Sequence, residues 1–491
     1  MLKESSLGVS AQVTAVATSL FSLPVYAKYL GAEQFSLVLL FSTIQAWLSL
    51  VDGGFSTALT QYISQSTSKE IGRDTIQTVV RSVIACIILF STLVILIIVL
   101  GLNSGSLPLF SGEYDNKDEL GTALNLIVIL GLSRVIEAVL RGALQGYRDF
   151  SFFYFSQIVS NLVKTGLCIL ALLAFSRSVV TFFEVQLLVS ALFLLLLSVR
   201  LKFHFRFSIL GAISLRSLTP LWPTASALSL NSALLVAATQ FDRAVLAIYL
   251  EPARFSEYLT AILISSMVAT IASPISQVSL PELQRAVTSG TESALRSSFR
   301  RSFGYSFAAT TVLLLCLLTF GLPILSIFFA GTLDVEAVYS WVVPLSICFA
   351  MSSLVGVPGQ LAIAVGRSGS IVSINFLNAA VSIGLGTWLI SGYRELASIL
   401  ILYVTQLTSL IGIFYILPDF RKRLNDAAAE IKSFFPAGGF LVTSYLIVRV
   451  LLDQLTGVPP WFYLGSVGVI ISLSVYLVQK RFKKAQRLPS A

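Results

Sequence analysis

Long apolar runs separated by short polar breaks follow one another along nearly the whole chain. About 20 consecutive apolar residues let a helix cross the hydrocarbon core of a bilayer. We therefore predict an all-α, polytopic membrane protein with about fourteen transmembrane helices. The predicted spans are residues 8–30, 35–60, 79–101, 121–143, 151–175, 180–200, 218–250, 257–280, 303–328, 339–365, 371–391, 396–417, 437–453 and 461–479.

Composition supports this assignment and adds an orientation. The chain is 56% hydrophobic and 12% charged, whereas soluble proteins carry about 25% charged residues. Most of the 33 Lys and Arg residues fall in loops on one side if the amino terminus is cytoplasmic. We therefore expect both termini in the cytoplasm and the first apolar run to be retained as a helix. Anionic lipid headgroups then account for the net charge of +9, and no nucleic acid is implied.

An internal repeat appears when the chain is shifted by 220 residues. Residues 27–36 then align with residues 247–256 with identity at five of ten positions, and three further loops keep the same register. We predict two six-helix bundles, residues 1–217 and 218–435, related by a pseudo-two-fold axis along the membrane normal. Residues 436–491 would add two C-terminal helices and a basic cytoplasmic tail. Two such bundles enclosing a cleft are typical of alternating-access transporters.

Charged side chains inside the spans are few, and the fourth span holds three. Arg134, Glu137 and Arg141 are spaced i, i+3 and i+7, which places them on one helical face. A charge at the bilayer centre costs at least about 2.5 kcal/mol on insertion scales, so such residues usually face the bundle interior or a water-filled cavity. The fifth span carries a similar polar face, made of Gln157, Asn161 and Lys164.

Two interpretations of these faces remain open. In the first, they line a cationic, substrate-binding cavity, where arginine contacts phosphate through two hydrogen bonds and lysine supplies a point charge. In the second, Glu137 pairs with Arg134, Arg141 or Lys164 and locks the helices together. The interpretations are compatible, because the cations outnumber the carboxylate.

Further polar residues are candidates for the same cavity. Asp52, near the inner end of the second span, either lines the cavity mouth or serves helix packing or capping. Gln240, Asp242 and Arg243 in the seventh span either line the outer half of the cleft or include an internal ion pair. Lys28 either contributes to the cavity or reaches the headgroups. An intramembrane carboxylate can carry a proton or bind sodium, which makes these residues candidates for binding a coupling ion: Asp52, Glu137 and Asp242.

Four segments together resemble a known family: residues 24–35, 50–55, 141–150 and 240–243. They are similar to motifs of the bacterial polysaccharide-export family that includes the O-antigen flippases, within the multidrug/oligosaccharidyl-lipid/polysaccharide flippase superfamily. The resemblance implies flipping of an undecaprenyl-pyrophosphate-linked oligosaccharide, such as an O-antigen unit of lipopolysaccharide, across the inner membrane. It also implies membrane lipids and polysaccharide-assembly proteins as partners. Fourteen spans resemble the lipid II flippases, whereas O-antigen flippases usually have twelve.

Two other functions are compatible with a chain of many spans. A membrane-integral polysaccharide polymerase or ligase generally has a large external loop, but the longest predicted here is short, about residues 102–120. A multidrug or cation extruder of the same superfamily would favour an acidic cavity. We expect no enzymatic activity, because the external loop at residues 102–120 offers no evident catalytic constellation. We expect no cofactor or metal site either, since the sequence shows no CxxC pair, and the lack of a phosphate-binding Gly-rich loop argues against direct ATP drive.

Overall fold

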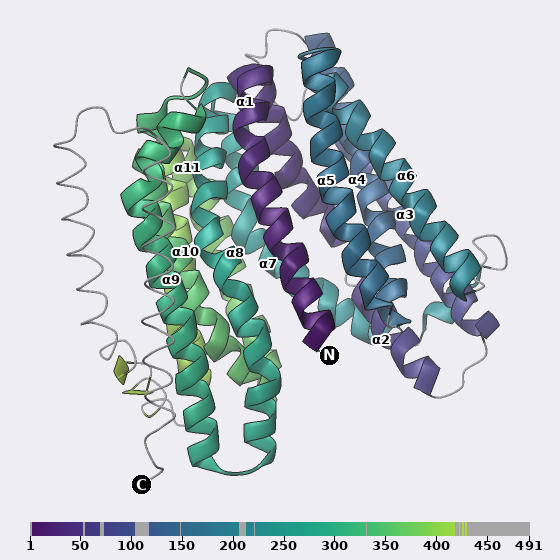
Figure 1. The fold of residues 1–491 in the computed structure, drawn as a ribbon, viewed down its shortest axis with the longest axis vertical. Coiled ribbons are helices and arrows are strands. Elements are labelled where there is room, and N and C mark those ends of the chain that lie inside the picture. Colours follow the sequence, from purple (N-terminus) through teal and green to yellow (C-terminus); the bar gives the residue numbers. More distant parts are fainter. Residues whose placement is uncertain are drawn as a thin grey trace. The chain divides into compact units, whose positions relative to one another are not determined.

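The fold is helical throughout the part that the computed structural model describes (Figure 1). That part comprises residues 2–52, 55–68, 73–103, 117–147, 149–205, 213–219, 221–329, 331–417, 422, 425–426 and 428–429. Its elements are α1 (Leu2–Asp52), α2 (Phe55–Ser68), α3 (Arg73–Asn103), α4 (Lys117–Gly146), α5 (Phe150–Ala174), α6 (Val179–Phe205), η2 (Leu215–Leu218), α7 (Trp222–Tyr249), α8 (Pro252–Thr288), α9 (Glu292–Phe329), α10 (Val335–Ala364) and α11 (Ser368–Ile416).

Seven of the described helices are long and apolar enough to cross a membrane, which confirms an all-helical, multi-pass membrane protein. The predicted spans 437–453 and 461–479 and the basic tail lie outside the described residues, so the total of about fourteen helices stays a prediction.

Two of the long helices are each interrupted by a kink. In α1 the kink is at Gly31 (φ 76°, ψ 168°), and in α11 it is at Arg394 (φ 46°, ψ −120°). These positions coincide with predicted breaks, so α1 contains the first predicted span and most of the second, and α11 contains the eleventh and twelfth. Glycine adopts a positive φ without steric cost, whereas arginine in this region is uncommon.

By contact clustering the chain forms two compact units. The first comprises Met1–Ser256 with Ser382–Ser398, and the second comprises Glu257–Val381 with Ile399–Ala491. In the first unit, a buried apolar core joins α2, α3, α4 and α6 to the start of α7. In the second, apolar residues at adjoining ends of α8 to α11 form another core. The predicted bundle boundaries at residues 217 and 435 stay predictions.

Helix α4 is the central element of the first unit, packing along α2 and α6, while α5 packs along α1 and α6 (Figure 1). Glycine permits the close approach of α2: a Cβ atom on Gly142 would lie 2.8 Å from the carbonyl oxygen of Ser56. The Thr60 hydroxyl donates a hydrogen bond to the Gly142 carbonyl at 2.8 Å. These contacts hold α4 against its neighbours along the turns that carry its charged residues.

The start of α5 is fixed by a charged cap. The Asp149 carboxylate accepts a hydrogen bond from the Phe152 backbone N–H at 3.4 Å and pairs with Arg200 of α6 at 2.9 Å. Aspartate at this position satisfies an N–H group that the first helical turn leaves unpaired. The cap therefore ties α5 to α6 and helps set where the α5 side chains meet α4.

Candidate functional site

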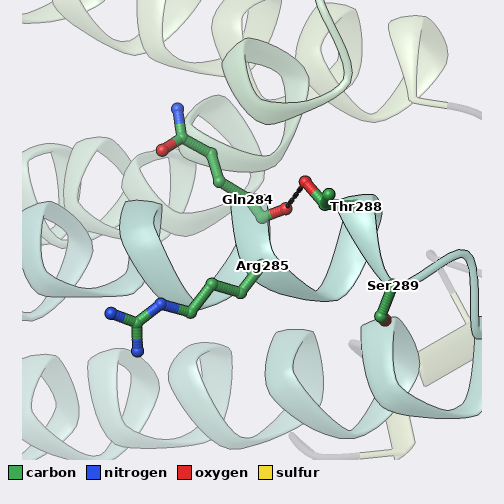
Figure 2. Close-up of a pocket in the computed structure, with 4 residues that line it drawn as sticks. All are labelled: Gln284, Arg285, Thr288 and Ser289. Atoms are coloured by element: carbon green, nitrogen blue, oxygen red, sulfur yellow. Dashed lines mark hydrogen bonds between the residues drawn. The ribbon is translucent and has the colours of Figure 1, made fainter.

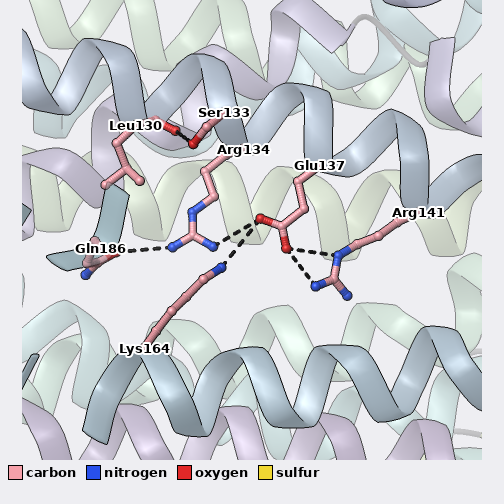
Figure 3. A network of polar contacts seen from close by, with 7 residues as sticks. All are labelled: Leu130, Ser133, Arg134, Glu137, Arg141, Lys164 and Gln186. Atoms are coloured by element: carbon pink, nitrogen blue, oxygen red, sulfur yellow. Dashed lines mark hydrogen bonds and ion pairs between the residues drawn. The ribbon is translucent and has the colours of Figure 1, made fainter. Parts of the chain in front are cut away.

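A buried charged cluster lies where α4, α5 and α6 meet (Figure 3). We call it the Glu137 cluster. The Glu137 carboxylate lies 2.7 Å from Arg141 Nη2, 3.5 Å from Arg134 Nη1 and 3.5 Å from Lys164 Nζ. On its other side, Arg134 donates a hydrogen bond to the side-chain oxygen of Gln186 at 3.1 Å. The cluster thus joins five polar side chains from three helices.

The charges in the Glu137 cluster do not balance. Three cationic side chains surround one carboxylate, and all are largely withdrawn from solvent: Glu137 is 6% exposed, Lys164 8%, Arg141 14% and Arg134 20%. Burying charge without a partner is strongly unfavourable. The cluster therefore favours an additional anion.

Hydrogen-bond donors in the cluster are also left over. Within the described part of the chain, the buried Arg134 Nε and Arg141 Nη1 atoms have no hydrogen-bond acceptor. Buried polar groups in proteins are nearly always paired. A ligand with several acceptor oxygens would satisfy these donors and supply the missing negative charge.

Two aromatic rings border the cations. The Phe153 ring centroid lies 6.0 Å from Arg141 Cζ, and the Phe193 centroid lies 6.0 Å from Lys164 Nζ. Such contacts stabilise a cation modestly, by about 0.5–2 kcal/mol, depending on its desolvation. They do not neutralise it, so the cluster keeps its attraction for an anion.

The structure brings together four residues that the sequence placed on two helical faces. Arg134, Glu137 and Arg141 share one face of α4, and Lys164 meets them from α5. The pairing of Glu137 with all three cations provides the contacts expected if these residues lock the helices together. The excess positive charge is compatible with a cationic, substrate-binding cavity.

Helices α5 and α6 carry three amide side chains, of which the sequence predicts Gln157 and Asn161 as site residues but not Gln186. Gln157 and Asn161 of α5 are half-buried and form no hydrogen bond within the described residues. Sequence reasoning missed Gln186. Its amide side chain in a largely apolar helix could have identified it as a candidate. Its role depends on how α6 packs against α4, which helical periodicity does not fix.

Asp242 of α7 forms a second buried polar site in the first unit. It is 1% exposed and accepts a hydrogen bond from the Ser398 hydroxyl of α11. Its other oxygen, Oδ1, has no hydrogen-bond donor among the described residues, and neither does the Gln240 Oε1 atom. Arg243 is half-buried. The neighbouring Arg243 interacts electrostatically with Asp242, which is compatible with the predicted internal ion pair, so both interpretations of Asp242 stay predictions.

The remaining predicted site residues lie at helix ends. Lys28 is exposed, in the turn of α1 that precedes the kink at Gly31. Asp52 is the last residue of α1, and its side chain lies outside the described residues. Neither is shown to take part in the Glu137 cluster.

A shallow pocket lies at the carboxyl end of α8 in the second unit (Figure 2). It is lined by Gln284, Arg285, Thr288 and Ser289, which are all exposed, and the Thr288 hydroxyl bonds back to the Gln284 carbonyl at 2.9 Å. One short stretch of helix with a single cation offers little selectivity. The Glu137 cluster is therefore the stronger candidate site.

Solved structures with the same fold cover most of the chain. The lipid II flippase MurJ in an inward closed conformation aligns with a TM-score of 0.69 and 12% identity, over 99% of this chain and 100% of that one. An inward-facing multidrug resistance MATE family transporter of the MOP superfamily aligns with a TM-score of 0.65 and 12% identity, over 86% and 99%. At such identities the likeness establishes the fold alone.

A further solved structure with this fold draws attention to its binding pocket. A MOP superfamily transporter from Pyrococcus furiosus, whose binding pocket is described as having reverse polarity that suggests a different function, aligns with a TM-score of 0.56 and 13% identity. The alignment covers 87% of this chain and 96% of that one. The fold therefore does not by itself determine what a site binds.

Sequence comparison adds the family. A search of curated proteins gives no match. Residues 1–287, more than half of the chain, match the family described as "Polysaccharide biosynthesis protein". The chain therefore belongs to the polysaccharide biosynthesis protein family.

Proposed function

We propose that this protein is a flippase that moves a lipid-linked saccharide across the membrane by alternating access. The observation that carries the proposal is the Glu137 cluster, in which one buried and two half-buried cations face one carboxylate and two buried arginine donor atoms are unpaired. We infer that its ligand is the diphosphate of an undecaprenyl-linked oligosaccharide, a repeat unit of a surface polysaccharide such as O-antigen.

The chemistry of the cluster suits a diphosphate. Guanidinium groups contact phosphate oxygens through paired, charge-assisted hydrogen bonds, which Arg134 and Arg141 could supply, and Lys164 adds a point charge. A diphosphate carries several acceptor oxygens and more than one negative charge. It would therefore neutralise the excess positive charge of the cluster and accept hydrogen bonds from its unpaired donors.

The membership of the family and the fold of the lipid II flippase MurJ support the same proposal. A cation extruder is the alternative that the MATE folds suggest. The Glu137 cluster disfavours it, because a buried positive site repels a cation strongly where the effective dielectric constant is low.

The location, partners and coupling ion of the protein are further parts of this proposal. We place the protein in the inner membrane with both termini cytoplasmic, in contact with polysaccharide-assembly proteins. Asp52, Glu137 and Asp242 are the candidates for binding a coupling ion, and the burial and unsatisfied oxygen of Asp242 support its candidacy. The protein itself would carry out no covalent chemistry.

Deletion and complementation test the proposal. A strain lacking the protein should fail to display its surface polysaccharide and should accumulate intracellular lipid-linked repeat units. Arg134→Ala should insert normally but reduce export by roughly ten- to a hundredfold, because a hydrogen bond to a charged group is worth about 1.5–3 kcal/mol. Arg285→Ala, which alters an exposed arginine in the second unit, is the matched control. Unchanged surface glycan in the deletion strain would rule out the flippase.

A further inference from the structure

The two oxygens of Glu137 are held unequally. Oε1 accepts from Arg141 Nη2 at 2.7 Å and from Arg141 Nε at 3.1 Å, a two-pronged contact within one helix. Oε2 accepts from Arg134 and Lys164 at 3.5 Å each. Charge-assisted N–H···O contacts are strongest near 2.7–2.9 Å and weaken as they lengthen. Arg141 therefore holds Glu137 firmly, whereas Arg134 and Lys164 contact it loosely.

Besides Arg141 Nη1, donors remain available on the loosely held side of the cluster. Arg134 has its unpaired Nε and a contact with Gln186 at 3.1 Å, which holds its guanidinium in place. Among the described residues, the only hydrogen bond of Lys164 Nζ is the long one to Glu137. An oxyanion between Arg134 and Lys164 could make shorter contacts with both without disturbing the pair between Glu137 and Arg141.

From this geometry we propose that Glu137 is a resident anion that competes with the substrate diphosphate for Arg134 and Lys164. In the empty state Glu137 Oε2 partly neutralises these two cations. When substrate binds, its phosphate oxygens replace Oε2, while Arg141 retains Glu137. The inference rests on the proposed function and deepens it by assigning the diphosphate to Arg134 and Lys164 and a release function to Glu137.

Competition of this kind serves transport. A carrier must bind its substrate well enough to load and weakly enough to unload, and two buried cations alone would hold a diphosphate tightly. The return of Glu137 Oε2 to Arg134 and Lys164 offsets part of the free energy lost when the diphosphate leaves. A glutamate whose Oε2 stayed in place would also weaken diphosphate binding, but through its charge alone, so a variant that keeps the charge and shortens the side chain separates the two roles.

Equilibrium binding of inorganic pyrophosphate to the full-length protein in neutral-lipid nanodiscs tests the inference. Glu137→Gln, which keeps the size of the side chain and removes its charge, should bind pyrophosphate roughly ten- to a hundredfold more tightly than wild type. Arg134→Gln should bind at least about tenfold more weakly. Glu184→Gln, an exposed glutamate on α6, should match wild type.

The outcomes separate this inference from the proposed function. If wild type binds, Arg134→Gln weakens binding and Glu137→Gln does not tighten it, the resident-anion role is wrong and the anionic-substrate proposal stands. If neither wild type nor Glu137→Gln binds pyrophosphate, both fail. Glu137→Asp separates competition from an effect of charge alone, because it keeps the charge while its shorter side chain lengthens the contacts of the carboxylate oxygen with Arg134 and Lys164. Binding should tighten severalfold, and unchanged affinity would overturn the inference.

Discussion

At the scale of single residues, Arg134 differs from the other cations of the cluster because it has polar contacts with two side chains, and these lie on different helices. It reaches Glu137 within α4 and Gln186 on α6, and it retains a further unpaired N–H group. A lysine would keep the charge but not the planar set of donors. The shape of the side chain should therefore matter as well as its charge.

Arg134→Lys tests the contribution of shape. We expect export intermediate between wild type and Arg134→Ala, because the substituted side chain still attracts phosphate but cannot hold Gln186 and a phosphate oxygen at once. Surface polysaccharide per cell at matched protein abundance is the measurement. Wild-type export by Arg134→Lys would show that charge alone suffices.

Arg394 provides a residue-scale prediction about stability. It has a positive φ of 46° and is exposed, and such a backbone costs a residue with a Cβ atom roughly 1–2 kcal/mol. Arg394→Gly should therefore raise the thermal unfolding midpoint of the purified protein. The extra chain entropy that glycine loses on folding reduces this stabilisation. Arg394→Ala removes the same side chain but keeps the Cβ atom, so it should leave the midpoint nearly unchanged. Equal midpoints for the two variants would contradict this account.

At the scale of elements, the close contact between α2 and α4 supports the helix that carries the cluster. A Cβ atom on Gly142 would lie 2.8 Å from the Ser56 carbonyl oxygen, and one on Gly146 would lie 2.8 Å from Ile63 Cβ. At such distances one of the helices must move. Glycines one turn apart on α4 therefore set how near α2 can lie.

Gly142→Ala should lower the unfolding midpoint, because overpacking of this kind costs about 1–3 kcal/mol. Gly121→Ala is the matched control on the same helix, since a Cβ atom there would meet nothing within 4 Å. It should be neutral or slightly stabilising, as alanine is the better helix former. Thermal unfolding in one detergent compares the two, and a Gly142→Ala protein as stable as Gly121→Ala would contradict the close-packing account.

The sequence could predict element-scale features that depend on local geometry. Helical periodicity placed Arg134, Glu137 and Arg141 on one face, and the polar break at Gly31 marked where α1 kinks. Proximity of consecutive helices then made the meeting of Lys164 with Glu137 predictable. Gln186 was not, because the rotation of α6 against α4 depends on side-chain packing along both helices, which apolar periodicity leaves open.

At the scale of the whole molecule, fold and charge carry different information. The chain shares its fold with a lipid II flippase and with a multidrug resistance transporter, so the fold alone does not choose between a lipid and a drug as the substrate. The charge excess around Glu137 favours an anion. The charged site, and not the fold, therefore indicates the function.

The predicted orientation is a whole-molecule property that loop charge determines. Reporter fusions should place residues 202–216 and the carboxyl terminus in the cytoplasm and residues 102–120 outside. A paired phosphatase and fluorescent-protein fusion at each position gives opposite signals for the two sides. Phosphatase activity from a carboxyl-terminal fusion would contradict the predicted even number of spans.

The most direct test of the central claim is translocation in vesicles that contain only this protein. Proteoliposomes are loaded with a fluorescent polyprenyl-diphosphate-linked oligosaccharide in both leaflets, and an impermeant quencher is added outside. The wild-type protein should expose nearly all of the fluorophore to the quencher, whereas Arg134→Ala vesicles should expose mainly the outer-leaflet share on the same timescale. If wild-type and protein-free vesicles lose the same fraction of fluorescence, the protein does not flip this lipid.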